Sequence, residues 1–460
     1  MKCGKVFHLF ACKIRKNLSK FSIILLIVKS LLNKNRKRFP MNNYTTNTYE
    51  IKRDIVNFSK KISNELNKST KKFIMDMQYG IAKSSSCLIS NISRSLNEEI
   101  KLKNTIERLC DNLVDLKDDE VDIIRKNYIN EIKELFPDEP IVLFDDSDIA
   151  KRYGKKFEDL DRVMDGSSLN KEIVNGYNVC EAVALTKDEK QPISLYSKIY
   201  SCQSKGFISK NQYTKESIDK VKETFNRKCN MIFDRGYDDN KIIEYVDNNN
   251  NYFVIRVNDR RTFLFKGKKK NCHEVAMRRK GKIKMELWFD DNEKREVYVS
   301  HTKVTLPSNK KDYELVIVYG LSDEKPLIVL TNRSIHSKED VIKVVRLYFY
   351  RWRIEEYFRA KKQEYEFENI RVRSLKAMNN LNLFLTIHMG YMSKLIEMMD
   401  KKLLTIKIIE RSKSIKNKVL IWLYQISRGI KEILSFAHTG ISEWQSIEKR
   451  KKMRQLSLKL

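Results

Sequence analysis

Residues 140–146 read Pro-Ile-Val-Leu-Phe-Asp-Asp, and the class of fold can be inferred by working outward from them. Four consecutive apolar residues directly after a proline are typical of a strand that is buried on both faces. Such strands belong to α/β sheets that helices cover on both sides. Because Asp145 and Asp146 follow at once, the stretch predicts a central strand that ends in carboxylates.

The chain after this strand alternates between strand and helix patterns. Residues 177–186 and 193–201 are separated by a polar turn and predict a hairpin, and residues 215–227 place apolar side chains on one helical face. The apolar run Met231-Ile232-Phe233 predicts another strand, which ends at Asp234. Asp239 then caps a helix, and residues 252–257 form a further strand. This order predicts an α/β domain with a mixed central sheet.

Residues 259–332 interrupt that alternation. Four segments in them alternate apolar and polar residues, with charged loops between, and predict a β-rich insertion. Ser337 with Asp340 three positions later is a variant of the capping box, and it predicts the start of a long helix from Glu339 to about Tyr365. The insertion therefore lies between the α/β strands and one long helix.

The charge of the chain indicates a polyanionic partner, with nucleic acid favoured over an anionic membrane. The 460 residues carry 91 Lys and Arg against 60 Asp and Glu, a net charge of +31, and 41% hydrophobic residues exclude a disordered chain. Residues 1–40 hold 11 basic and no acidic residues, and residues 401–460 hold 15 against 4, so the two ends supply +22. We expect a basic extension (1–48), a helical region (49–138) and a basic helical C-terminal region (376–460), with either Met1 or Met41 as the start.

Two other classes of protein are disfavoured. The eight cysteines show no C-x-x-C pair and no Cys/His ligand spacing, so neither a zinc site nor a disulfide framework is indicated. The longest apolar run in the basic extension, Phe21–Val28, is far shorter than the ~20 residues that a spanning helix needs. We therefore expect no membrane partner and a cytoplasmic protein associated with the nucleoid.

A polar stripe on the predicted long helix supplies the third candidate carboxylate. At helical spacing, Tyr348, Arg351, Glu355, Arg359 and Lys362 fall along one narrow strip between two apolar flanks. A helix with such a strip suits a position inside the domain, with the strip opening on a site. The alternative is an i,i+4 ion pair between Arg351 and Glu355 alone, and Asp145 and Asp234 can also be ordinary turn residues at strand ends.

Carboxylates from two strands and a helix suit an oxygen-preferring cation such as Mg²⁺. A pair of such ions activates water or a 3′ hydroxyl in phosphodiester chemistry. The basic side chains beside the acids are suited to holding phosphates. The pattern predicts a two-metal site for phosphoryl transfer on a nucleic acid.

These segments resemble a known family. Tyr348-x2-Arg351-x3-Glu355-x6-Lys362 is similar to the Y-R-E-K signature of the insertion-sequence-four group of DDE transposases, and Asp234-Arg-Gly-Tyr-Asp238 is similar to its D-R-x-x-D segment. The segment that begins at Asp145 resembles the first-aspartate segment. The resemblance spans about residues 140–375 and implies an RNase H-like catalytic domain over 139–375 with its insertion at about 259–332.

The resemblance also implies the roles of the site residues. Asp145, Asp234 and Glu355 would be catalytic and would hold two Mg²⁺ ions, which Mn²⁺ can replace, with Asp146 as a rival to its neighbour Asp145. The DNA-binding residues would be Tyr348, Arg351, Arg359 and Lys362. Relatives that flip a base during hairpin formation use a Trp where this chain has Leu327. Trp288, elsewhere in the insertion, is the residue that could take the role of that Trp.

The function implied is that of a DNA transposase. It would cleave at the terminal inverted repeats of its insertion sequence and join the 3′ ends to target DNA, as a homodimer that bridges two ends of double-stranded DNA in a synaptic complex. One alternative is a two-metal nuclease of the same fold without strand transfer. The other is a non-catalytic, sequence-specific DNA-binding protein derived from a transposase.

Overall fold

The computed structural model describes residues 42–166, 172–289, 293–322, 325–398, 403–412 and 423–457. Most of the predicted basic extension, including its apolar run, lies outside these residues. The chain divides into two compact units, residues 1–49 and 50–460, and every strand that the structure describes belongs to the second. No helix in the described ranges is both long enough and apolar enough to cross a bilayer.

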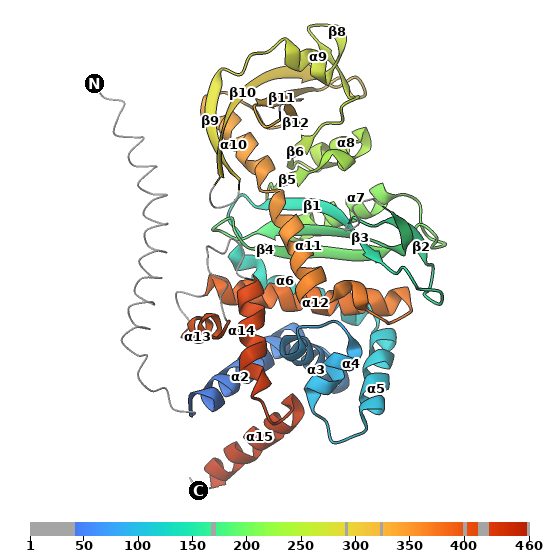
Figure 1. Ribbon diagram of the computed structural model, residues 1–460, viewed down its shortest axis with the longest axis vertical. Coiled ribbons are helices and arrows are strands. Elements are labelled where there is room, and N and C mark those ends of the chain that lie inside the picture. Colours follow the sequence, from blue (N-terminus) through green and yellow to red (C-terminus); the bar gives the residue numbers. More distant parts are fainter. Residues whose placement is uncertain are drawn as a thin grey trace, which may run out of the picture. The chain divides into compact units, whose positions relative to one another are not determined.

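Five strands form the centre of the sheet, in the order β4-β3-β1-β5-β6 (Figure 1). Their bounds are β1 Ile141–Ala150, β3 Ile173–Leu185, β4 Pro192–Tyr200, β5 Asn230–Phe233 and β6 Tyr252–Arg256. β3 and β4 form the predicted hairpin, β1 is antiparallel to β3, and β1, β5 and β6 run parallel. The predicted α/β domain with a mixed central sheet is confirmed. A short strand that was not predicted, β2 (Asp161–Met164), pairs with the start of β3.

Strand β1 is longer than its apolar run. It continues through Asp145 and Asp146 to Ala150, because the β3 strand offers it backbone partners over that whole length. On its other side β1 pairs with β5 only up to Phe144, where β5 ends at Phe233. The two apolar runs therefore stop side by side, and Phe144 stacks on Phe233 with ring centroids 4.5 Å apart.

The insertion extends this sheet. Its elements are β7 Thr262–Phe265, β8 Lys268–Asn271, α9 Cys272–Met277, β9 Ile283–Phe289, β10 Glu293–Thr305, β11 Asp312–Tyr319 and β12 Leu327–Thr331. Strand β12 pairs antiparallel with β6, so the insertion and the central strands form one sheet. The four predicted strands correspond to β9–β12, whereas the β7–β8 hairpin and α9 were not predicted.

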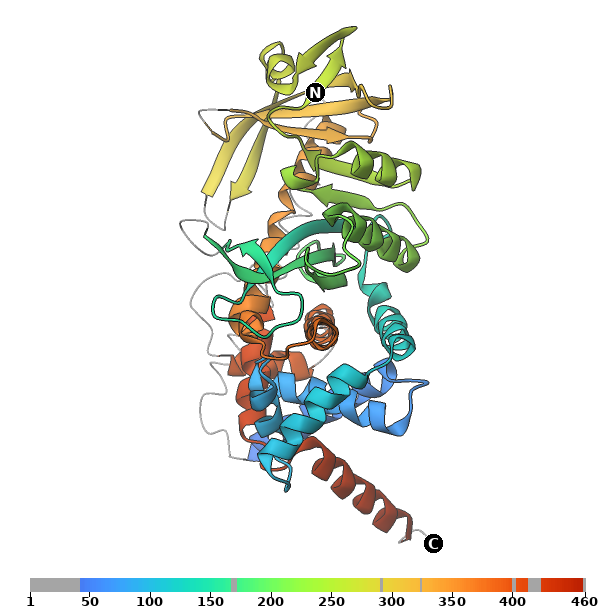
Figure 2. The same ribbon diagram turned by 90° about the vertical axis from the view of Figure 1, so that its right-hand side faces the viewer.

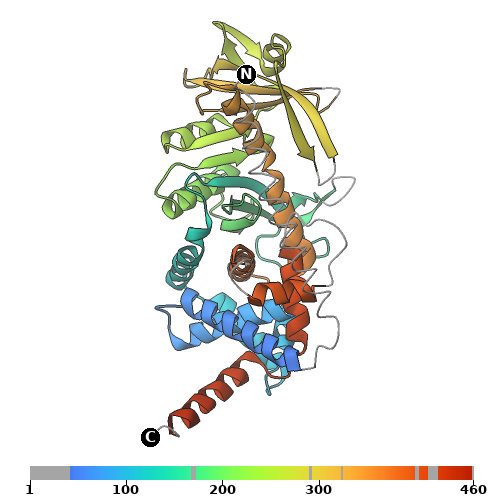
Figure 3. The ribbon, with the colours of Figure 1, turned by 90° about the vertical axis from the view of Figure 1, so that its left-hand side faces the viewer.

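Helices cover the two faces of the central strands separately. α7 (Lys210–Thr224) and α8 (Asn240–Asn248) lie on one side, and α10 (Lys338–Phe349) and α11 (Trp352–Glu364) lie on the other (Figures 2 and 3). The predicted caps are present, since Asp239 accepts from the backbone N–H of Lys241 and Ser337 forms a reciprocal box with Asp340. This layering gives each face of β1 its own set of helical neighbours.

The predicted long helix is interrupted. Between α10 and α11 the backbone N–H groups of Arg351, Arg353 and Ile354 donate to the carbonyls three residues earlier, at 3.1, 2.9 and 3.1 Å. Such i→i−3 bonds tighten the turn relative to an α-helix. The sequence predicts one continuous helix from Glu339 to about Tyr365, and the structure divides it into α10 and α11 at this turn.

Helices from both ends of the chain pack against one another. The N-terminal ones are α2 Asn42–Ile62, α3 Lys68–Ser84, α4 Ile89–Leu96, α5 Leu102–Asp115 and α6 Asp118–Ile132, and the C-terminal ones are α12 Leu375–Glu397, α13 Leu403–Arg411, α14 Leu423–Ser435 and α15 Ile441–Ser457. α12 lies between strand β4 and helices α3 and α5. Its backbone carbonyl at Phe384 accepts from the Gln78 amide at 3.0 Å. The apolar cluster around α12 is thus continuous with the core of the sheet.

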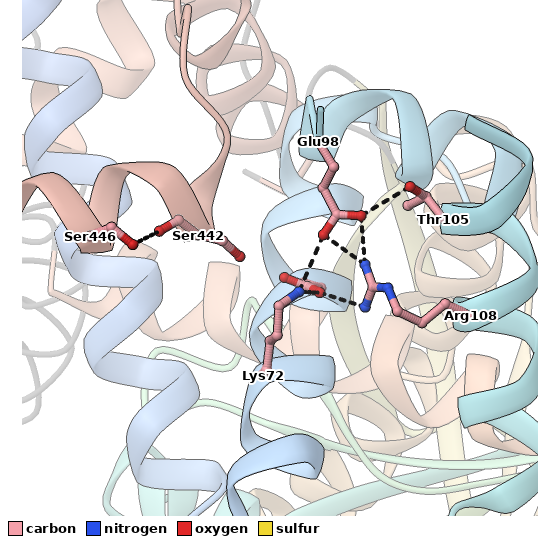
Figure 4. Close-up of polar contacts among 7 residues, drawn as sticks. Lys72, Glu98, Thr105, Arg108, Ser442 and Ser446 are labelled. Atoms are coloured by element: carbon pink, nitrogen blue, oxygen red, sulfur yellow. Dashed lines mark hydrogen bonds and ion pairs between the residues drawn. The ribbon is translucent and has the colours of Figure 1, made fainter. Parts of the chain in front are cut away.

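Charges within these N-terminal helices neutralise each other (Figure 4). The guanidinium of Arg108 lies 3.0 Å from Asp76 and 2.9 Å from Glu98, and Lys72 lies 2.6 Å from the same oxygen of Asp76. Burial raises the pKa of Asp76, and the two cations oppose that shift. These basic side chains are therefore paired with Asp76 of α3 and with Glu98 of the loop between α4 and α5.

Candidate active site

The carboxylates of Asp145 and Asp234 come from neighbouring parallel strands. Phe144 pairs with Phe233, so each aspartate is the first residue beyond the same point of the register. β1 continues past Asp145, whereas Asp234 directly precedes a short 3₁₀ helix, Arg235–Tyr237. The carboxyl edge of parallel strands is where α/β folds place functional groups. The register alone therefore brings these two acids together, as the sequence predicts.

Glu355 of helix α11 is held near the two aspartates by Arg351, which contacts all three carboxylates. The guanidinium of Arg351 lies 2.7 Å from Oε1 of Glu355, 3.5 Å from Oδ2 of Asp145 and 3.9 Å from Oδ1 of Asp234. Only 12% of the Arg351 side chain is exposed, while the three carboxylates are between 21% and 36% exposed. The structure therefore gathers all three predicted acids around one buried cation.

The electrostatics of Asp145 reflect this crowding. Burial raises the pKa of Asp145 to about 7, and the charges of Asp234 and Asp146 act in the same direction. The Arg351 guanidinium opposes the shift by favouring the charged carboxylate. A carboxyl group held in this way gains from any further positive charge placed beside it.

The other residues of the predicted stripe divide into two groups. The Tyr348 hydroxyl donates to Oδ1 of Asp234 at 3.4 Å. Burial raises the pKa of the Tyr348 hydroxyl. Lys362 lies away from the three acids, with its ammonium 2.9 Å from Glu368 and 3.4 Å from Asp148. Arg359 pairs with Glu356 and is 52% exposed. Tyr348 and Arg351 thus line the site, whereas Lys362 and Arg359 lie beyond it.

Asp146 faces the opposite side of the sheet from Asp145. Successive side chains of a strand alternate between faces, and Asp146 pairs with Cys180 whereas Asp145 pairs with Glu181. The neighbours of Asp146 include Tyr237 and Cys180, and burial raises the pKa of Asp146. The geometry therefore places Asp145, and not its rival, on the face of Arg351.

A buried ion pair behind the site was not predicted. Lys361 and Glu181 are both fully buried and lie 2.8 Å apart, with the Ser197 hydroxyl 2.7 Å from the same carboxylate oxygen. Lys361 follows Glu355 on α11, and Glu181 is the cross-strand neighbour of Asp145. Nothing in the sequence separates Lys361 from the adjacent Lys362, because only the phase of α11 against the sheet decides which of them is buried.

The donor set suits a hard divalent cation in its chemistry. Asp145, Asp234 and Glu355 offer only carboxylate oxygens, which Mg²⁺ prefers. Across the described ranges, no group of three or more His, Cys, Asp or Glu side chains lies close enough to hold an ion. The Arg351 guanidinium lies among the three carboxylates instead. A bound cation would take over the charge that Arg351 now supplies.

A cavity of about 440 Å³ opens beside the acids. Its walls include Tyr348, Arg351 and Trp352 from the helices, and Leu327 from β12. Arg256 at the end of β6 also lines it, and the insertion adds Asp259, His273, Arg295 and Lys325. Trp352 is 54% exposed, while Trp288 lies in strand β9 and its side chain is outside the described part. The cavity therefore joins residues of the insertion to Tyr348 and Arg351, the two side chains that contact the acids.

Comparisons with known proteins bear on the same region. Residues 194–389 match the family model of the transposase DDE domain. The cryo-EM structure of a piggyBac transposase synaptic complex with hairpin DNA is similar with a TM-score of 0.42 and 12% sequence identity, over 84% of this chain and 77% of that one. A comparison with curated proteins found no match. The part of the chain from β4 into α12 is therefore similar to a transposase DDE domain.

Proposed function

We propose that this protein is a Mg²⁺-dependent DNA transposase. The observation that carries the proposal is the convergence of Asp145, Asp234 and Glu355 on one guanidinium, from two parallel strands and a helix. The similarity of residues 194–389 to a transposase DDE domain supports it, because that stretch contains Asp234 and Glu355. Asp145 lies before the matched stretch and is included because its carboxylate lies beside the Arg351 guanidinium and its segment resembles the first-aspartate segment.

The chemistry proposed is phosphodiester hydrolysis followed by transesterification. Two divalent cations, when bound, supply the charge that activates the attacking oxygen and stabilises the leaving one. Asp145, Asp234 and Glu355 would hold them, and Mn²⁺ can replace Mg²⁺. Arg351, released from the acids, and Tyr348 would position the scissile phosphate, with Lys362 and Arg359 holding phosphates further along the strand.

The substrates proposed are the terminal inverted repeats of an insertion sequence and a target duplex. Nicking at each repeat frees a 3′ hydroxyl, which then attacks target DNA. A homodimer would bridge two ends, with the helical region 49–138 and the basic region 376–460 holding them. The stripe from Tyr348 to Lys362 supports placing the chain in the insertion-sequence-four group. A protein that acts on an insertion sequence and a target duplex would work in the cytoplasm, at the nucleoid.

The test of catalysis is the Glu355→Gln variant. It keeps the size of the side chain and removes its charge, so we expect cleavage of DNA that carries the element's ends to be lost while binding of those ends survives. Glu339→Gln is the matched control, because Glu339 is an exposed carboxylate at the start of α10. Full cleavage by Glu355→Gln would rule out the assignment of this residue.

Strand transfer separates the transposase from a nuclease of the same fold. The assay uses pre-cleaved ends with a free 3′ hydroxyl, a target plasmid and Mg²⁺. A transposase joins the ends to the plasmid, whereas a nuclease nicks DNA and yields no joined product. Binding without either reaction would indicate a non-catalytic DNA-binding protein.

A further inference from the structure

The insertion carries a concentrated basic surface, in a segment that is distant in sequence from the two basic ends of the chain. Residues 266–282, which we call the insertion tip, hold eight Lys and Arg and one acid, Glu274, a net charge of +7. The tip comprises the turn between β7 and β8, strand β8, helix α9 and the segment that follows (Figure 1). Neither the metal site nor the polar stripe on α10 and α11 uses these residues.

The insertion tip is a well-anchored platform. Cys272, Val275 and Ala276 of α9 are almost completely buried, and the Tyr319 hydroxyl of β11 donates to the Ala276 carbonyl at 2.8 Å. Asn271 and Glu274 form a reciprocal capping box at the start of α9. The basic side chains therefore project from a fixed backbone.

Most cations of the tip have no acidic partner. Lys270 lies 2.9 Å from Glu274, and Arg279 donates to the His301 carbonyl at 2.8 Å. Four further lysines are exposed and form no ion pair within the part of the chain that the structure describes: Lys268, Lys269, Lys280 and Lys282. This charge remains available for an external anion.

The helical region at residues 49–138 differs in this respect. It contains 16 Lys and Arg and 16 Asp and Glu, a net charge of zero. Several of its cations are engaged internally, as Arg108 is with Asp76 and Glu98. Because non-specific affinity for a polyanion comes from cations that are not already neutralised, the tip is the better electrostatic contact.

The tip and the candidate active site share one cavity. Its lining includes Cys272 and His273 of α9 together with Tyr348 and Arg351 beside the acids. The same lining includes Arg295 and Lys325, together with Asp259, whose carboxylate lies 3.9 Å from the Lys325 ammonium. A rod of regularly spaced phosphates is an anion long enough to contact the tip and the cavity together.

We propose that the insertion tip binds the phosphate backbone of the DNA duplex whose scissile phosphate lies at Asp145, Asp234 and Glu355. The position of the scissile phosphate rests on the proposed function, whereas the contact with DNA does not. An anionic membrane fits less well, because Met277 is the large apolar side chain that the tip exposes and a single one gives no apolar face to insert.

The experiment measures binding of the full chain to a fluorescein-labelled duplex of random sequence by anisotropy over a series of salt concentrations. The tip variant is Lys269→Gln with Lys280→Gln. The matched control is Lys303→Gln with Lys310→Gln, two exposed lysines of the same insertion outside the tip. Each phosphate contact contributes about 0.9 to the slope of log K against log salt, so two contacts contribute about 1.8.

We expect the tip variant to bind more weakly, with a slope lower by about 1.8, and the control to keep the wild-type slope. An unchanged slope in the tip variant, or an equal fall in the control, overturns the proposal. So does loss of binding to phosphatidylserine vesicles in the tip variant with DNA binding intact, which would indicate a membrane contact.

A nicking assay on the wild-type protein separates this proposal from the proposed function. If the wild type nicks DNA and the tip variant keeps its slope, the tip proposal alone fails. If the wild type cuts no DNA but the slope falls in the tip variant, the tip contact stands and the catalytic proposal fails.

Discussion

The Nη2 atom of Arg351 lies 2.7 Å from Oε1 of Glu355, and the same guanidinium also reaches Asp145 and Asp234. Arg351 sits at the interruption between α10 and α11, where the tighter turn brings its side chain over the ends of β1 and β5. One guanidinium therefore lies close to three carboxylates and neutralises only part of their charge. A divalent cation that binds these carboxylates has to compete with Arg351 for them.

Removing that competitor should tighten metal binding. We expect Arg351→Ala to bind Mn²⁺ about tenfold more tightly, a change of ~1.4 kcal/mol, because the ion no longer displaces a partly buried ion pair. Titration calorimetry of the full chain without DNA measures this affinity. Arg359→Ala is the control, since Arg359 pairs with Glu356 outside the site. Weaker or unchanged Mn²⁺ binding in Arg351→Ala would contradict this account.

The two adjacent aspartates should behave differently. We expect Asp145→Asn to lower Mn²⁺ affinity by at least about tenfold, because it removes a carboxylate on the face of Arg351. Asp146→Asn should keep the wild-type affinity, since its side chain lies on the other face of β1. An equal loss of Mn²⁺ affinity in both variants would show that Asp146 also contributes to the metal site.

Stability tests the burial of Asp146 separately from metal binding. Burial raises the pKa of Asp146, so its charged form is less favourable in the folded state than in the unfolded one. Its contribution to stability therefore decreases as pH rises above the ordinary aspartate range. At pH 8 we expect Asp146→Asn to unfold at the same urea concentration as the wild type or a higher one.

The parts of the site that depend on strand ends could be predicted from the sequence. The apolar runs before Asp145 and Asp234 stop abruptly, and parallel pairing of β1 with β5 follows from their burial on both faces. The box formed by Ser337 and Asp340 is likewise local, because it depends on residues three positions apart. Local chemistry and side-chain period were sufficient for these features.

Other parts could not be predicted, because they depend on the phase of one element against another. The choice between Asp145 and Asp146 requires knowing which face α11 covers, and the burial of Lys361 requires the rotation of that helix. The interruption at Arg351 is not marked by Pro or Gly. The β7–β8 hairpin is short and rich in lysine, so its strands lack the alternating apolar pattern that identifies β9–β12.

The buried pair of Lys361 and Glu181 should be strongly coupled. Lys361→Met leaves the Glu181 carboxylate buried without its counter-charge, so we expect a loss of about 3–5 kcal/mol in the free energy of unfolding. The double variant Lys361→Met with Glu181→Leu removes both charges and should recover most of that loss. Denaturation in urea is measured for the wild type, for Lys361→Met, for Glu181→Leu and for the double variant. Additive losses in the double variant would mean that the two side chains do not stabilise each other.

His388 should make the protein sensitive to acid. It is buried in α12 with its ring 5.6 Å from that of Tyr365, and burial lowers its pKa from 6.5 to about 3. The unfolded chain therefore takes up a proton below about pH 6.5 that the folded chain does not, so stability falls as pH drops from there toward about 3.

The contribution of His388 is measured as a difference between two proteins. Other groups titrate alike in the wild type and in His388→Leu, so their effects cancel when the free energies of unfolding are subtracted at each pH. Between about pH 6.5 and 5 we expect the wild type to lose ~2 kcal/mol relative to the variant. The exposed His438 serves as the control, because it is solvated in both states and His438→Leu should leave the acid sensitivity unchanged. A difference that does not vary with pH would mean that His388 is protonated to the same extent in the folded and unfolded chains.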